Sequence, residues 1–84
     1  MKIRVIILPK PDLLDPQGEA INVSLLNLGF SEVKSVRQGK VIDLELSEVD
    51  FKVAFARVEE MCEKLLANSI IENYYMEKLW REWA

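Results

Sequence analysis

The chain of 84 residues contains no histidine and only one cysteine, Cys62. Without histidine, the chain cannot form a Cys/His metal site, use a histidine as acid or base, or form a Ser-His or Cys-His nucleophile pair of its own. A single cysteine also excludes an intramolecular disulfide. Cys62 lies among apolar residues at helical spacing, so we interpret it as a core residue rather than as a reactive thiol.

Positive charge and long apolar runs are scarce as well. The formal net charge is −3, which argues against a protein that binds nucleic acid by neutralising phosphates. The longest apolar run near the amino terminus, Val5 to Leu8, is too short for a signal peptide or a membrane-spanning helix. We therefore expect a cytoplasmic protein that binds neither nucleic acid nor a membrane.

The strongest pattern that is present is helical and runs from Asp50 to Asn68. Its apolar residues recur at i, i+3, i+4 and i+7, which predicts a helix with one buried stripe. The stripe consists of Phe51, Ala54, Phe55, Val58, Met61, Cys62 and Leu65. Ser47 or Asp50 is suited to cap its start, and Asn68 to end it in the left-handed conformation.

The rest of the chain predicts the surface on which this helix lies. We expect the following further elements: strand 2–8, helix 16–28, a short strand 33–37, strand 41–46 and strand 70–78. The third of these alternates imperfectly, and a hairpin around residues 37–40 would join it to the next strand. The order βαββαβ predicts one α+β domain over residues 1–84 with the ferredoxin-like arrangement, in which two helices cover one face of a four-stranded antiparallel sheet.

Such a fold leaves the other face of the sheet uncovered. That face would carry Ile6, Leu8 and Val41, and Tyr74, Met76 and Trp80 are candidates for the same face. Because half of the chain is hydrophobic, we expect a homo-oligomer built across this face or along a sheet edge. Trp80 and Trp83 are equally suited to anchor an interface and to fold back over the sheet.

The polar candidates each have an ordinary structural interpretation. We interpret Asp43 and Glu45, and the glutamates of the second helix, as solvated carboxylates, because nothing predicts a cleft around them. Asp15-Pro16-Gln17-Gly18 is typical of a helix start, although a helix start with a glycine can also meet a phosphate. Arg37, Lys40 and Lys10 lie near turns and are either solvated or bind an anionic group of a partner.

Four short motifs stand out in the sequence: Asp15-Pro16-Gln17-Gly18, Leu28-Gly29-Phe30, Arg37-x-Gly39-Lys40 and Cys62-Glu63-Lys64-Leu65-Leu66-Ala67-Asn68. Together they resemble the PurS family, the small subunits of phosphoribosylformylglycinamidine (FGAM) synthase. The resemblance covers residues 2–77. It departs from the family pattern at Asp12, at Ser69 and in the tail that carries two tryptophans.

The resemblance implies a single PurS-like domain that is a non-catalytic subunit of an enzyme of purine biosynthesis. It implies that the subunit forms a homodimer or tetramer, bridges the glutaminase subunit PurQ and the synthetase subunit PurL, and supports ammonia transfer between them. ATP and magnesium would bind in the synthetase subunit, with no catalytic, cofactor or metal residue in this chain. The shared motifs imply subunit contacts at Asp15, Pro16, Gln17, Gly18, Arg37, Gly39 and Lys40.

Two alternatives remain open on the sequence. One is a stand-alone ferredoxin-like regulatory domain that binds a small metabolite at a dimer interface. The other is a small acylphosphatase-like enzyme, for which the chain lacks the glycine-rich anion loop.

Overall fold

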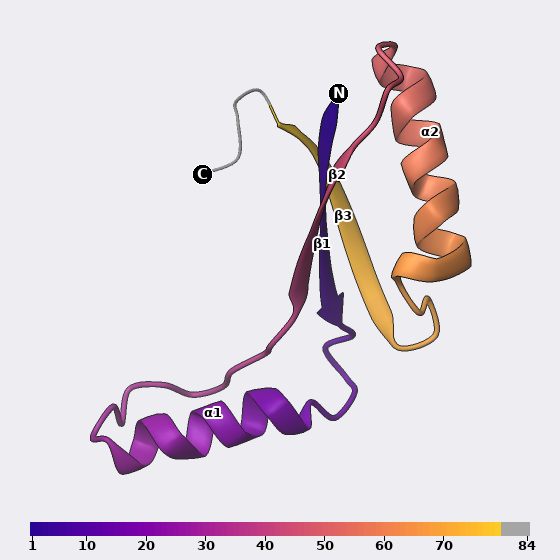
Figure 1. Ribbon diagram of the computed structural model, residues 1–84. Coiled ribbons are helices and arrows are strands. Elements are labelled where there is room, and N and C mark those ends of the chain that lie inside the picture. The colour runs from indigo at the N-terminus through magenta and orange to yellow at the C-terminus, as the bar shows by residue number, and fades with distance from the viewer. Residues whose placement is uncertain (80–84) are drawn as a thin grey trace.

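A computed structural model describes residues 1–79 (Figure 1). In chain order the elements are strand β1 (Lys2–Pro9), helix α1 (Pro16–Asn27), strand β2 (Lys40–Glu45), helix α2 (Phe51–Met61), the π-helix η1 (Cys62–Leu66) and strand β3 (Glu72–Leu79). Among the described residues, helix α1 and strands β1, β2 and β3 begin and end within two residues of the positions that the sequence predicts. The predicted second helix is present as well, but it is divided into α2 and η1.

The sheet has three antiparallel strands in the order β2-β1-β3, so β1 is the central strand. Val5 stands opposite Ile42 on one side and Met76 on the other. Alternate residues of β1 point to opposite faces, and Ile3, Val5 and Ile7 are fully buried on the face that α2 covers. These three residues form the centre of the core.

Helix α2 starts where the sequence predicts and closes the core from one side. The Asp50 side chain caps it by accepting hydrogen bonds from the backbone N–H groups of Lys52 and Val53. Below the cap, three residues of its stripe, Ala54, Val58 and Cys62, are fully buried in the same cluster as the β1 residues. The predicted stripe is therefore confirmed at these three positions, whereas Phe51 at its start is exposed.

The end of the second helix differs from the prediction. The chain widens into the π-helix η1, which changes the helical phase so that Leu66 packs against the core while Leu65 remains 83% exposed. The helix then ends at Ala67 in an extended conformation. The predicted left-handed stop at Asn68 is wrong, since Gly29 is the one residue of the described chain with a positive φ.

The predicted four-stranded sheet is also wrong, because residues 33–37 form no strand. Val33 and Val36 are half-buried while their neighbours are exposed, and a spacing of three suits packing against a helix better than the alternation of a strand. The Val36 carbonyl indeed lies against Gly18 of α1. The segment therefore runs back along α1 instead of joining the sheet, and no hairpin forms at residues 37–40.

Helix α1 lies beyond the end of the sheet rather than on its face (Figure 1). None of the described residues in or against the core cluster comes from α1. The prediction of two helices on one sheet face is therefore wrong as well, because α1 pairs with the returning segment 28–39. We call α1 and this segment together the arm (residues 16–39). The arm gives the chain a radius of gyration of 16.0 Å, against about 12 Å for a compact chain of this length.

The second face of the sheet is open, as the sequence suggests, but its composition differs. Val41 and Tyr75 are each 58% exposed there, and Ile6 and Leu8 are half-buried. Tyr74 and Met76, two candidates for this face, instead pack against the core on the α2 side. Trp80, Trp83 and the rest of the tail lie outside the described residues.

Candidate functional site

The candidate site is the junction at which the arm leaves the sheet. Its centre is Asp15, the residue before α1, whose carboxylate accepts hydrogen bonds from two backbone N–H groups. Gly18 N–H donates to Oδ1 at 3.1 Å, and Gln38 N–H donates to Oδ2 at 2.7 Å. These two bonds, the one from Gln38 first, hold the pKa of Asp15 below its usual value. One carboxylate thus caps α1 and fastens the returning segment to its start.

Three further contacts complete the junction. The Gln38 side-chain amide donates to Gln17 Oε1 at 2.8 Å, and the Arg37 guanidinium donates to the carbonyl of Pro9 at the end of β1. In addition, the Lys10 N–H donates to the Ile71 carbonyl at 3.0 Å, which fixes the loop after β1 to the start of β3. The arm is therefore tied to the end of β1, and the loop that follows β1 is in turn fixed to the chain just before β3.

Two glycines are required because other chain segments pass close to them. A Cβ on Gly18 would overlap the Val36 carbonyl oxygen and lie 2.5 Å from Asp15 Oδ2. A Cβ on Gly39 would overlap the Ile7 carbonyl oxygen and lie 2.7 Å from the Leu8 side chain. In both places the missing side chain allows two segments to approach each other.

The structure brings together most of the residues that the motifs single out. Asp15, Gln17, Gly18, Arg37 and Gly39 all lie in the junction, although they come from two separate motifs. Pro16 occupies the first helical turn of α1, and Lys40 opens β2 opposite Ile7. Whether these residues touch another subunit stays a prediction, since each of the bonds described is internal to this chain.

Sequence reasoning missed Gln38, which is bonded through both its backbone and its side chain. Gln38 stands at the unspecified position of the Arg37-x-Gly39-Lys40 motif. Its place between the motif residues was the one feature of the sequence that could have identified it as part of the junction. A polar residue in a turn is usually solvated, so its chemistry alone does not predict two partners.

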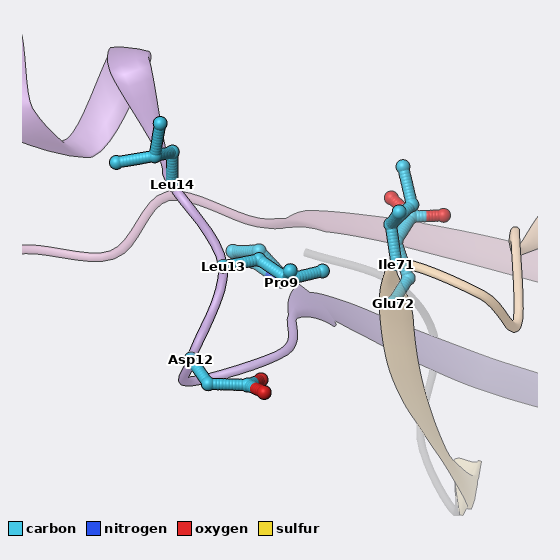
Figure 2. Close-up of a pocket in the computed structure, with 6 residues that line it drawn as sticks. All are labelled: Pro9, Asp12, Leu13, Leu14, Ile71 and Glu72. Carbon is cyan, nitrogen blue, oxygen red and sulfur yellow. The ribbon is translucent and has the colours of Figure 1, made fainter.

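An open apolar hollow borders the junction. It lies between the loop after β1, which carries Leu13 and Leu14, and the turn before β3, which carries Ile71 (Figure 2). Leu14 is 95% exposed, and Ile70, the neighbour of Ile71, is exposed as well. Large apolar side chains that converge on one edge of a small domain are typical of a contact surface.

The charged candidates elsewhere are engaged in local pairs. Asp43 pairs with Arg4 (2.8 Å) on the open sheet face, and this bond lowers the pKa of the Asp43 carboxyl. Glu60 bonds Lys64 and Arg57 on the outer side of α2. Within residues 1–79 no three acidic or cysteine side chains are grouped so as to hold a metal ion.

Cys62 is fully buried, and burial raises the pKa of its thiol, with the nearby Glu63 adding to the effect. A raised pKa opposes the formation of the reactive thiolate. This agrees with the interpretation of Cys62 as a core residue.

None of the helices in residues 1–79 has the length and apolar composition needed to cross a bilayer. The fold and the junction together define a small α+β protein that holds a helix with exposed apolar residues beyond the end of its sheet. Comparison with known proteins gives the particular family: the PurS model, described as phosphoribosylformylglycinamidine (FGAM) synthase, matches residues 2–79. The chain belongs to the PurS family and is a subunit of FGAM synthase.

Individual relatives agree. The chain is 42% identical to the PurS subunit of FGAM synthase from Synechocystis over 88% of its length and 74% of that protein. It is also 42% identical to the Bacillus subtilis PurS subunit, over 90% and 89% of the two chains. These matches favour the enzyme subunit over the stand-alone regulatory domain and the acylphosphatase-like enzyme.

Solved structures share the fold. Methanocaldococcus jannaschii PurS aligns with a TM-score of 0.81 at 42% identity, over 90% of this chain and 92% of that one. A chain in the structure of PurLQS from Thermotoga maritima aligns with a TM-score of 0.85 at 32% identity, over 93% and 95%. An alignment over 93% of 84 residues omits only about six of them. It therefore includes most of the arm as well as the sheet and α2.

Proposed function

We propose that this chain is the non-catalytic subunit that joins the glutaminase PurQ to the synthetase PurL of FGAM synthase and supports ammonia transfer between them. The observation that carries the proposal is the family match over residues 2–79, which includes both the core and the arm. The solved relative from Thermotoga maritima is described as PurLQS, a complex of the three kinds of subunit.

In this division of labour the glutaminase releases ammonia from glutamine. The synthetase uses ATP and magnesium to activate the amide of formylglycinamide ribonucleotide, and the ammonia converts that amide to an amidine. This chain supplies contact surface and no reacting group. Its place is the cytoplasm, and it associates with itself as a dimer or tetramer as well as with PurQ and PurL.

The contact surface that supports this proposal lies around the junction. The hollow beside Leu13 and Ile71 is apolar, and Lys40 and Gln17 line a more polar hollow next to it. An apolar centre with a polar rim is the usual composition of a protein interface. We propose the residues Asp15, Pro16, Gln17, Gly18, Arg37, Gly39 and Lys40 as the part of this chain nearest the other subunits.

The first test is co-purification of the tagged chain with PurQ and PurL in the presence of glutamine. We expect Lys40→Glu to weaken capture, because it reverses a charge at the rim while leaving the junction bonds in place. Arg37→Glu should weaken it further, since it also removes the bond to Pro9. Lys52→Glu, on the exposed side of α2, is the matched control. Equal capture of all variants would contradict the assignment of the contact residues but not the subunit role.

The second test addresses the role itself. FGAM formation by PurL and PurQ is measured with and without this chain, using either glutamine or free ammonium as the nitrogen source. We expect omission of the chain to reduce the glutamine-driven rate much more than the ammonium-driven rate. Glutamine-driven turnover that is unchanged without the chain would overturn the proposed function.

A further inference from the structure

The second helix changes its winding just before it ends. Its fully buried residues Ala54, Val58 and Cys62 recur every four residues and form one row against the sheet. An α-helix turns by about 100° per residue, so a row with this spacing drifts around the helix axis. The π-helix η1 corrects the drift, because its wider turn brings Leu66 back into the row, where it packs against the core.

A second leucine stands ready for the same core position. On an uninterrupted α-helix Leu65 would lie about 20° from the centre of the buried row, and Leu66 about 80° from it. Two helical registers can therefore fill the position: the π register with Leu66 and the α register with Leu65. The observed π register leaves Leu65 83% exposed and buries Leu66 only halfway. Burial of one leucine or the other thus distinguishes the two registers only weakly.

Backbone hydrogen bonding does not decide between the registers either. In the π register the Ala67 N–H donates to the Cys62 carbonyl, five residues earlier, at 3.1 Å. In the α register the same N–H would donate to the carbonyl of Glu63 instead. The donor keeps a partner in both cases, so no buried N–H group is left unpaired by the exchange.

The contacts on either side confine the change of register to a few residues. The Tyr74 hydroxyl donates to Glu63 at 2.7 Å, which fixes the start of η1 to β3. After the helix, Asn68 accepts hydrogen bonds from the backbone N–H groups of residues 70–72 through its side chain and its carbonyl. These bonds lie within the turn and do not involve η1. The turn can therefore move as one unit when the helix end rotates.

This turn carries one wall of the apolar hollow. Ile71 lines the hollow together with Leu13 of the loop after β1 (Figure 2). The Ile71 carbonyl also accepts the hydrogen bond from the Lys10 N–H, at 3.0 Å, that fixes this loop. A rotation of the helix end changes the point from which the turn starts. It therefore moves Ile71 relative to the loop.

We propose that the end of the second helix is a register switch, in which Leu65 and Leu66 exchange places in the core and the apolar hollow changes shape with them. In the π register the turn is docked on the loop after β1. In the α register the turn is displaced, and the bond between Lys10 and Ile71 is broken. A partner that contacts the exposed Leu65 holds the π register, because the α register buries this side chain.

A double-mutant cycle, measured by urea unfolding, tests the exchange of the two leucines. In a fixed π register Leu65→Ala is silent in every background, because the side chain is exposed. In a switch it is silent only while Leu66 fills the core. We expect Leu65→Ala to change the unfolding equilibrium constant by less than about twofold in the wild-type chain, and by roughly fivefold or more in the Leu66→Ala chain.

Met61→Ala provides the matched control background. Met61 is half-buried and packs against the core, as Leu66 does, but it precedes the change of register. Leu65→Ala should therefore stay silent in the Met61→Ala chain. All chains are compared at one concentration and at the same native mass, so that association does not contribute to the differences. An effect of Leu65→Ala that is equal in all three backgrounds would overturn the proposal.

Amide exchange of Lys10, followed by nuclear magnetic resonance, tests the link to the hollow. We expect Leu66→Ala to accelerate this exchange by shifting the population toward the α register, and Met61→Ala to leave it unchanged. Adding Leu65→Ala to Leu66→Ala removes the residue that fills the core in the α register. The exchange of Lys10 should then slow again, although the chain as a whole is less stable. Exchange that only follows overall stability would show that the hollow is not coupled to the helix end.

Discussion

Replacing Gly18 by alanine places a methyl group at the tightest point of the junction. The new Cβ would overlap the Val36 carbonyl oxygen and lie 2.5 Å from Asp15 Oδ2, whereas real Cβ atoms stay at least 3.0 Å from such atoms. The neighbours must therefore move apart by about half an ångström or more. One of them is backbone, which cannot turn away as a flexible side chain does.

Two effects of opposite sign determine the size of the change. Crowding of a close-packed site costs about 1–3 kcal/mol, and exchanging glycine for alanine in a helix gains up to about 1 kcal/mol. The gain is small here because Gly18 lies in the first turn of α1. We expect crowding to dominate and the junction to lose about 1–2 kcal/mol, which corresponds to a roughly 5- to 30-fold change in the opening equilibrium.

Hydrogen exchange measured by mass spectrometry detects this loss locally, because peptides from the arm and from the sheet are followed separately. We expect exchange in residues 16–39 to accelerate roughly 5- to 30-fold, while the peptides of β1 and β3 change little. Ser24→Ala, at an exposed position of the same helix, is the control and should slow exchange slightly. If Gly18→Ala leaves exchange in the arm unchanged or slows it, the argument from close approach is refuted.

Three further predictions follow from other parts of the chain. The pKa of Asp15 is held below its usual value of 3.8. Its hydrogen bonds therefore stabilise the arm above pH 3.8, and this stabilisation is lost as the pH falls below that value. We expect Asp15→Asn to loosen the arm at neutral pH and to abolish this acid dependence, as measured by hydrogen exchange. The hydrogen bond to Glu63 raises the pKa of Tyr74 to about 12. The stabilisation that this bond gives to the fold is therefore present below pH 10 and is lost as the pH rises toward 12. We expect Glu63→Ala to bring the pKa of Tyr74, followed by ultraviolet absorbance, back toward 10. Ile7→Ala should lower the free energy of unfolding by about 2–5 kcal/mol in a urea titration, and Ile6→Ala, which is only half-buried, by clearly less.

The sequence predicted the elements that each bury one face in the core of their own chain. The alternation of Ile3, Val5 and Ile7 and the helical spacing of Ala54 and Val58 both follow from one buried face each. These faces meet in the core, and their prediction is confirmed. Local pattern is sufficient here because each residue's burial depends only on which side of its element it occupies.

The arm could not be predicted in the same way. The apolar residues of α1 have the spacing of a helix that packs on a surface, and this pattern is the same whether that surface belongs to its own sheet or to another chain. The Val33–Val36 spacing was the one local indication that the segment does not join the sheet. Likewise the junction depends on contacts between Asp15 and Gln38, which are 23 residues apart, and periodicity contains no information on such a pairing.

This difference explains why two of the four motifs that resemble the family meet at the junction, which depends on particular residues. A core accepts one apolar residue for another of similar volume at modest cost, so the buried face of β1 specifies a pattern more than particular residues. The junction accepts little exchange. Gly18 and Gly39 are required because any side chain would meet backbone atoms, and Asp15 is required because one group must accept two N–H donors from different segments. The two motifs that meet here therefore set the direction of the arm. Because this direction determines which surface α1 can reach, a loosened junction should impair assembly before it impairs folding.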